Sequence, residues 1–456
     1  MAKEFDVYTG MIEYKGISFS FMFDKKELRL IPPEEKRREI YYDWFSEEIS
    51  PGAYAFGNLP VMEEAYLMGR CNEDGRKIIF ITRQGAGIGR YNSVLVIEVI
   101  GYVLCRYDKE IIDRINFCGP EINCIHPIGQ AFTYTYKEEY FERGILTIQT
   151  NSFDETTTAE QSFYVDHHLV KIHFGISRGI STVVGESPLK LNSSLTFDFE
   201  PTDDYSLIIK LWRIAKQFVQ YLCYSQNVTF SKMELCAPYE GGKHEGFAEL
   251  NITSDKSVSD VECLKKGHYI HQKDIGGFEG DILNDIASGK LYIRHLPETY
   301  QKGRQKNASD FILTIAAFEW ELKRLFPELV KQKKNGEKVF LSEKITGAIE
   351  KMMTIMEVFG KQLYEFNGEV FDGDAIGKRL AKQRNNFSHG NLDQEFIGHS
   401  LLDLVFMEYL VYGMQLKKYG IPDVKIQKCI NDLFQKHIMI KERSSEECKE
   451  DPPNSI

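Results

Sequence analysis

The first part of the chain alternates apolar and polar positions with a period of two. Ile17, Phe19, Phe21 and Phe23 follow this pattern, and the pair Lys25-Lys26 then leads into the apolar stretch "ELRLI". Similar segments recur up to about residue 200 and are separated by turn clusters such as "NEDG". Short alternating segments at this density, with almost no helical pattern between them, predict an antiparallel sheet, a sandwich or an open barrel.

The period changes after "FEPTDDYS", where Leu207, Leu211, Ile214 and Phe218 lie along one face of a predicted helix. From about residue 308 onward every segment has helical spacing. The expected helices cover 310–328, 342–364, about 374–390, about 395–418 and a stretch after Pro422.

These patterns predict an α+β protein built in two parts. A β-rich domain is expected over residues 1–300 and an all-α helical bundle over residues 301–440. The polar tail, residues 441–456, is expected to be disordered.

Composition and charge exclude some classes of protein. The net charge of -11 argues against a protein that coats duplex nucleic acid through bulk positive charge. The nine cysteines include no CxxC pair, no apolar run reaches the roughly 18 residues of a membrane span, and the amino terminus has no signal-peptide pattern. The sequence thus predicts a reduced, cytoplasmic chain without a membrane segment.

The stretch "RNNFSHG", from Arg384 to Gly390, is the strongest candidate for chemistry. Arg384 lies four positions after Leu380 and three before Phe387, so we expect it to point toward the bundle or a partner. Glu319 interrupts the apolar stripe of the first bundle helix and would compensate its charge. The alternative is purely structural: an Arg384–Glu319 ion pair, a cation in the last helical turn, and a glycine after the cap.

The segment Arg384-Asn385-Asn386-Phe387-Ser388-His389 resembles the nuclease signature of HEPN domains, in which an arginine, a polar residue, three further residues and a histidine occur in this order. The "FEWELKRLF" helix and "RNNFSHGNLD" resemble more particularly the Apea-like HEPN family, and the layout of the front half is similar to the β-rich domain that accompanies it. The resemblance spans most of the chain, but only the six-residue motif is specific.

The resemblance implies a metal-independent endoribonuclease of anti-phage abortive infection that acts as a homodimer through the bundle. Its RNA substrate would be tRNA or another structured RNA, and a phage protein would be the trigger. In this interpretation His389 moves the proton of the attacking 2′-hydroxyl and Arg384 stabilises charge on the phosphate. Asn385 orients His389 or the scissile phosphate, and Glu319 supports the site. No metal and no cofactor are expected.

A non-enzymatic function remains the main alternative. The bundle would then be a dimerisation or nucleotide-binding module, and the front domain would bind a ligand or a phage protein.

The loop after the first bundle helix contains four lysines, at positions 331, 333, 334 and 338. This loop is either simply solvated or helps to steer RNA. The glycines at 85, 87 and 89 fit a hairpin better than a dinucleotide-binding loop, because the spacing is GxGxG and a strand follows.

Overall fold

The computed structural model describes residues 5–57, 59–135, 147–185, 187, 189–299, 305–331, 338–390, 396 and 399–439. By their contacts, the residues divide into two compact units. The first contains residues 1–123, 127–216 and 229–258, and the second contains residues 124–126, 217–228 and 259–456. The first unit is rich in strands and the second is helical, so the predicted α+β class is confirmed.

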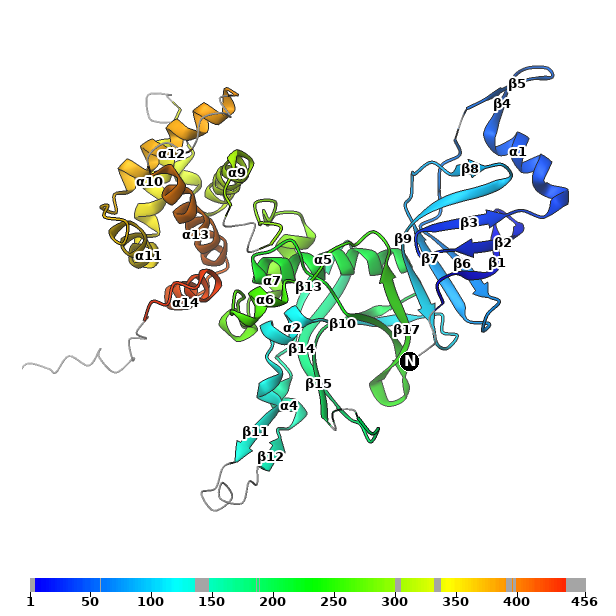
Figure 1. The fold of residues 1–456 in the computed structure, drawn as a ribbon, viewed down its shortest axis with the longest axis horizontal. Helices are drawn as coiled ribbons and strands as arrows, with labels where there is room; N and C mark the ends of the chain where they lie inside the picture. Colours follow the sequence, from blue (N-terminus) through cyan, green and yellow to red (C-terminus); the bar gives the residue numbers. More distant parts are fainter. Residues whose placement is uncertain are drawn as a thin grey trace, which may run out of the picture. The chain divides into compact units, whose positions relative to one another are not determined.

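Six strands of the first unit close into an antiparallel barrel (Figure 1). Each pairs with its neighbours in the order β6-β1-β2-β3-β9-β7, and β7 returns to β6. The barrel strands are β1 (Tyr8–Tyr14), β2 (Ile17–Phe23), β3 (Glu27–Ile31), β6 (Tyr66–Cys71), β7 (Lys77–Thr82) and β9 (Val94–Cys105). The hairpin predicted from Ile17 to "ELRLI" is therefore confirmed as β2–β3, with Phe23 opposite Leu28.

Aromatic rings fill the interior of the barrel. The Phe21 and Phe23 rings contact Phe80 at centroid distances of 5.2 and 5.0 Å, and Phe23 lies 5.1 Å from Tyr102. Each of these fully buried aromatic side chains contributes about 1.5–3 kcal/mol of apolar transfer free energy. Gly10 is required where β1 pairs with β6, since a β-carbon there would lie 2.0 Å from the Arg70 carbonyl oxygen.

The long strand β9 joins the barrel to the rest of the sheet, because it pairs with β17 as well as with β3 and β7. From β17 the sheet continues through β16, β10, β15 and β14 to β13. These strands are β10 (Ile112–Cys118), β13 (Gln161–Val165), β14 (His168–Ile180), β15 (Leu189–Thr202), β16 (Lys232–Tyr239) and β17 (Lys243–Ile252), and β8 (Gly89–Tyr91) pairs with β9. Two separate hairpins, β4 (Ser46–Ser50) with β5 (Ala53–Phe56) and β11 (Phe132–Thr135) with β12 (Thr147–Thr150), complete the strands.

Helices of the first unit are few. They are α1 (Arg37–Phe45), most of α2 (Pro120–Ile125), α4 (Phe153–Thr156) and the first part of α5 (Tyr205–Cys223), which passes into the second unit after Lys216. The sequence pattern missed α1, because only Ile40 and Phe45 of this charged segment are buried. The predicted α5 is confirmed, and the Asp204 carboxylate accepts a hydrogen bond from the Ser206 N–H at its start (2.8 Å).

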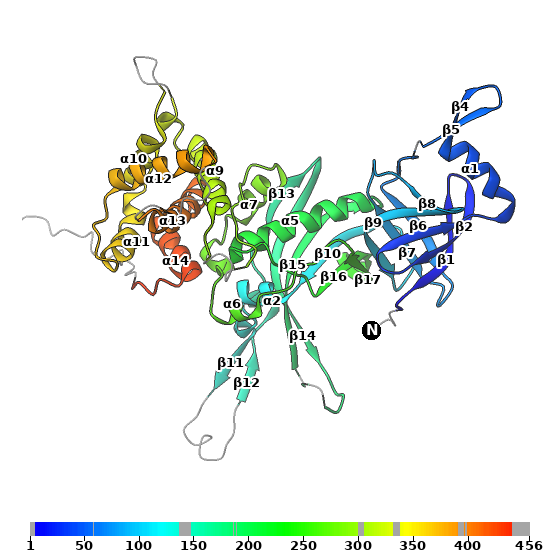
Figure 2. The ribbon, with the colours of Figure 1, turned by 45° about the horizontal axis from the view of Figure 1, so that its top comes forward.

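Figure 2 shows the helices of the second unit from a second direction. They are α6 (Val261–Lys265), α7 (Glu279–Ala287), α9 (Ala308–Leu325), α10 (Leu341–Lys351), α11 (Met353–Glu365), α12 (Gly373–Ser388), α13 (Ser400–Lys418) and α14 (Asp423–Phe434). The helix expected over 342–364 is divided at Met352, whose backbone leaves the helical range (φ -102°, ψ 10°). The expected tail, residues 441–456, lies outside the described residues, as do Lys333 and Lys334.

Helix α13 is the central helix of this bundle. It packs against α9, α11, α12 and α14, and its residues from Phe406 to Leu416 are all buried. A helix that is apolar on nearly every side must be covered on nearly every side, which explains the long apolar run in the sequence. No helix among the described residues is both long enough and apolar enough to cross a membrane.

Close packing of α10 and α12 depends on Gly377. A β-carbon at this position would lie 2.7 Å from the Ser342 carbonyl oxygen and 2.9 Å from Thr346 Oγ1. We therefore expect Gly377→Ala to lower the free energy of unfolding by about 1–3 kcal/mol, because the backbone of α10 must move. Urea unfolding followed by circular dichroism measures this difference.

The matched control is Gly347→Ala, also inside a helix. There the added carbon would meet only the flexible Leu329 side chain, at 3.1 Å. Alanine has a helix propensity about 1 kcal/mol better than glycine, so this variant should be neutral or more stable. Equal stability of the two variants would contradict the proposed close contact.

Candidate functional site

The RNNFSHG motif occupies the last turn of α12 and its cap. The helix begins at Asp372, whose carboxylate accepts hydrogen bonds from the N–H groups of Asp374 (2.9 Å) and Ala375 (3.3 Å). It ends at Ser388, with His389 as the C-cap and Gly390 in the left-handed region (φ 79°). The predicted end of this helix is confirmed.

The buried face of α12 differs from the expected one by one position. It consists of Ile376, Leu380, Gln383 and Phe387, at spacings of four, three and four. Gln383, not Arg384, therefore occupies the inward position between Leu380 and Phe387, and it accepts a hydrogen bond from the Ser400 hydroxyl (3.3 Å). Of the two expected directions for Arg384, the one into the bundle is wrong, because an uncharged amide fills that place, and the one toward a partner stays a prediction.

All three candidate catalytic side chains lie on the surface of the second unit. Arg384, Asn385 and His389 are exposed. Glu319 on α9 is half-buried and pairs with Lys344 (3.3 Å). Among the described residues no ion pair joins Arg384 to Glu319, whereas His389 at the cap and Gly390 in the left-handed region agree with the other two parts of the structural alternative.

The rotation of α12 is set by a buried acid on the central helix. Asp403 of α13 is fully buried and accepts hydrogen bonds from Arg379 Nε and Nη2, both at 2.7 Å. The Tyr364 hydroxyl of α11 donates to the same carboxylate at 2.5 Å. Because Arg379 must face Asp403, the side of α12 that carries Asn385 and His389 must face away.

The three motif side chains do not converge within one helix. Residues five apart, such as Arg384 and His389, differ by about 140° around a helix axis, whereas Asn385 and His389, four apart, lie on the same side. One copy of the motif therefore presents its arginine and its histidine in different directions. The backbone departs from the helix only at the cap, where His389 stands (φ -92°, ψ 11°).

Comparison with known proteins does not add to this geometry. No protein-family model matches the chain, and neither a curated protein nor a solved structure matches it. The HEPN resemblance rests on the motif and its place in the helical bundle alone. Within the described ranges, no cluster of three or more His, Cys, Asp or Glu side chains is arranged to hold a metal ion.

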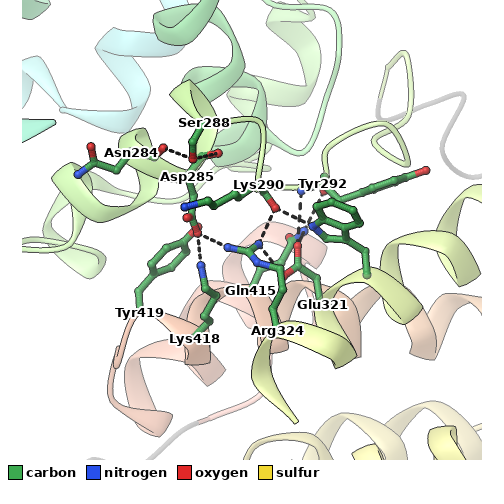
Figure 3. A network of polar contacts seen from close by, with 11 residues as sticks. Asn284, Asp285, Ser288, Lys290, Tyr292, Glu321, Arg324, Gln415, Lys418 and Tyr419 are labelled. Atoms are coloured by element: carbon green, nitrogen blue, oxygen red, sulfur yellow. Dashed lines mark hydrogen bonds and ion pairs between the residues drawn. The ribbon is translucent and has the colours of Figure 1, made fainter. Parts of the chain in front are cut away.

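A second group of polar residues lies around Arg324, at the end of α9 (Figure 3). Its guanidinium donates to Glu321 Oε2 (3.0 Å), to the Lys290 carbonyl oxygen (2.6 Å) and to Asp285 of α7. Asp285 also pairs with Lys418 and accepts a hydrogen bond from the Tyr419 hydroxyl (3.0 Å). Two acids and two cations thus neutralise one another where α7, α9 and α13 meet.

Ionisation within this group follows from burial and pairing. Burial opposes the charge of Asp285, but hydrogen bonds from Lys418 and Arg324 outweigh it and lower the pKa of this carboxyl. Burial raises the pKa of Glu321, against the attraction of Arg324 and a hydrogen bond from Gln415 (3.3 Å). Every member of this group has a partner inside the bundle, so we assign the group a structural role.

The sequence pattern did not identify the buried ion pairs of the second unit. The signal was present, since Asp403 and Glu408 both interrupt the apolar run of α13 and buried acids require partners. The partners themselves, Arg379 and Lys306, come from distant segments and cannot be chosen without the fold.

Removing the Asp285 charge should destabilise the protein in a pH-dependent way. Asp285→Asn leaves Arg324 and Lys418 partly unpaired, and we expect a loss of about 3–5 kcal/mol at pH 7. Because the folded-state pKa lies below the ordinary 3.8, this contribution is present above pH 3.8 and is lost as the pH falls further. Urea unfolding of wild type and variant at several pH values tests the trend.

Glu357→Gln supplies the control for this measurement. Glu357 pairs with Lys361 (2.6 Å), and both side chains are about half exposed. Exposed pairs contribute little, so this variant should unfold like the wild type at every pH. A difference between wild type and Asp285→Asn that did not shrink in acid would show that the charge is not the stabilising feature.

Proposed function

We propose that the protein is a metal-independent endoribonuclease whose site is built from Arg384, Asn385 and His389. The observation that carries the proposal is the exposure of Arg384 together with the pairing of Glu319 to Lys344. Other charges that the described bundle holds near its core, such as Asp403 and Glu408, are paired with Arg379 and Lys306. An arginine left available to solvent is suited to bind a phosphate group.

The chemistry that these side chains support is transesterification of RNA. In the proposed reaction the 2′-oxygen forms a bond to phosphorus, the bond from phosphorus to the 5′-oxygen breaks, and a 2′,3′-cyclic phosphate remains. His389 accepts the proton of the 2′-hydroxyl, and the departing 5′-oxygen takes up a proton from a second histidine or from water. Arg384 donates hydrogen bonds to the non-bridging oxygens, where negative charge accumulates.

Asn385 is proposed as a positioning residue. It lies on the same side of α12 as His389, four positions earlier, and its backbone carbonyl accepts the His389 N–H (3.1 Å). Its side-chain amide both donates and accepts hydrogen bonds, so it suits the orientation of either the imidazole or the scissile phosphate.

We further propose that two copies act together. The divergence of Arg384 and His389 on one helix supports a site in which each copy supplies its motif to a shared cleft. The exposed position of the motif, at the end of α12, is where a second copy can approach. The substrate would be tRNA or another structured RNA, since such RNA presents unpaired loops whose 2′-hydroxyls can rotate into line.

The proposed biological role is anti-phage defence by growth arrest, with a phage protein as the trigger and the β-rich front domain as its receptor. This part of the proposal rests on the resemblance to the Apea-like HEPN family. Cleavage of host tRNA stops translation, and such an activity must be silent until infection.

Loss of either motif side chain should abolish RNA cleavage. We expect wild-type protein to cleave end-labelled total tRNA in EDTA, with phage-infected extract supplied as the source of trigger. His389→Ala and Arg384→Ala should reduce the rate by at least about a hundredfold, the usual effect of removing a general base or a charge-stabilising group. Gel electrophoresis of the RNA measures the rate.

Two control variants separate the motif from general effects of charge. Lys378→Ala removes an exposed cation on the same helix that is paired with Asp374 (2.6 Å), and His399→Gln removes a histidine that pairs with Glu369 (2.9 Å). Both should cleave RNA at the wild-type rate. Equal cleavage by wild type and His389→Ala would show that the motif has a structural role and would favour the non-enzymatic function.

A further inference from the structure

A cavity of about 700 Å³ lies beside α13 within the second unit. One wall is the side of α13 that carries Leu402, Val405 and Glu408, and another is the end of α14 at Phe434. Its volume is within the range of about 300–1,000 Å³ typical of small-molecule sites. The motif residues of α12 do not line it, so this cavity is separate from the proposed nuclease site.

The charge of the lining is predominantly positive. Lys266, Lys306 and Lys436 line the cavity, and Glu408 is the one acidic residue among its described lining residues. Glu408 and Lys306 form a buried ion pair at 2.5 Å, with side chains 6% and 7% exposed. Lys266 and Lys436 are further basic residues of the lining, and a lining with more basic than acidic residues favours an anionic ligand.

Aromatic rings form the apolar part of the lining. Phe434 contacts Tyr409 at 4.5 Å and Tyr224 at 4.9 Å between ring centroids. Lys436 Nζ lies 5.0 Å from the centre of the Tyr409 ring, which places positive charge next to the aromatic surface. A planar ring that carries negative charge matches both features.

A buried polar group lines the same cavity. The Tyr224 side chain is 4% exposed, and its hydroxyl lies near the Glu408 carboxylate without a hydrogen bond of ordinary geometry to any described residue. Behind it lies His295, 6.0 Å away between ring centroids and 5% exposed, whose two ring nitrogens also lack partners in the described part of the chain. A buried polar group without a full hydrogen bond lowers stability, and a bound ligand can relieve this penalty at Tyr224.

The ionisation state of His295 agrees with exclusion of water at the Tyr224 side of the cavity. Burial, together with the nearby Lys306 charge, lowers the pKa of His295 to about 3. The imidazole is therefore neutral at physiological pH and adds no positive charge there.

We propose that this cavity binds a small molecule with a planar ring and at least two negative charges, such as a nucleoside 5′-phosphate or an aromatic dicarboxylate. Lys266 and Lys436 contact the anionic groups, and the Tyr224–Tyr409–Phe434 cluster packs on the ring. The Glu408 carboxylate and the Tyr224 hydroxyl bond to polar atoms at the edge of the ring. This inference does not rest on the nuclease proposal, because binding is measured without RNA.

Isothermal titration calorimetry with the full-length protein tests the inference. The probes are the four common nucleoside 5′-monophosphates and benzene-1,2-dicarboxylate, and inorganic phosphate and adenosine are the partial ligands. At least one probe with both ring and charge should bind with Kd below about 1 mM, and the partial ligands should bind at least about tenfold more weakly. The two classes of probe distinguish a phosphate from a carboxylate source.

Charge-reversal and cavity-filling variants locate the binding. Lys266→Glu and Lys436→Glu should each weaken the best probe at least about tenfold, and Val405→Trp should block it without any change of charge. Lys361→Glu on α11, an exposed lysine outside the cavity, should leave the affinity unchanged. The inference is overturned if no probe binds at about 1 mM, or if binding is insensitive to all three cavity variants.

Discussion

A single buried carboxylate, Asp403, determines what the bundle presents to solvent. An unpaired charge at the centre of a bundle would cost several kcal/mol, so α12 must turn Arg379 toward α13 and α11 must supply the Tyr364 hydroxyl. Gln383 then lies inside, one turn further along, next to Ser400. With that side of α12 fixed, Arg384 and His389 can only lie outside. The exposure of the motif is thus a consequence of the packing of its neighbours.

Charged residues in the second unit fall into two groups, one paired inside the unit and one exposed to solvent. Those around Arg324 and the Lys306–Glu408 pair are buried and neutralised, so they fix helices against one another. Arg384 and His389 are exposed, and the expected neutralising acid, Glu319, contacts Lys344 instead. The cavity beside α13 is lined by both kinds of charged residue. The buried Lys306–Glu408 pair, which has no net charge, lies beside lysines that are closer to solvent. Helix α13 connects these features, because Asp403 and Glu408 lie on it five residues apart.

Local patterns predicted the elements better than the contacts between them. Alternation along Ile17–Phe23 gave the β2–β3 hairpin, and the apolar spacing after Pro422 gave α14, because each reflects burial of one face. Closure of the barrel could not be predicted, since it depends on β9 pairing with three strands from distant parts of the chain. The motif was found from its spacing, but the inward direction considered for Arg384 was wrong, because Leu380 and Phe387 are equally compatible with an inward residue at 383 or 384. Only the partner helix, through Asp403, selects between them.

The central claim is that motifs from two copies form one ribonuclease site, and subunit complementation tests it most directly. Arg384→Ala and His389→Ala proteins, each inactive alone, would be co-expressed so that mixed dimers form. Cleavage of labelled tRNA in EDTA would be measured with phage-infected extract supplied as the source of trigger. A wild-type dimer has two Arg–His pairs across the cleft and a mixed dimer keeps one of them. Because random pairing makes about half of the dimers mixed, about a quarter of wild-type activity is predicted. The account is contradicted if verified mixed dimers are as inactive as either parent.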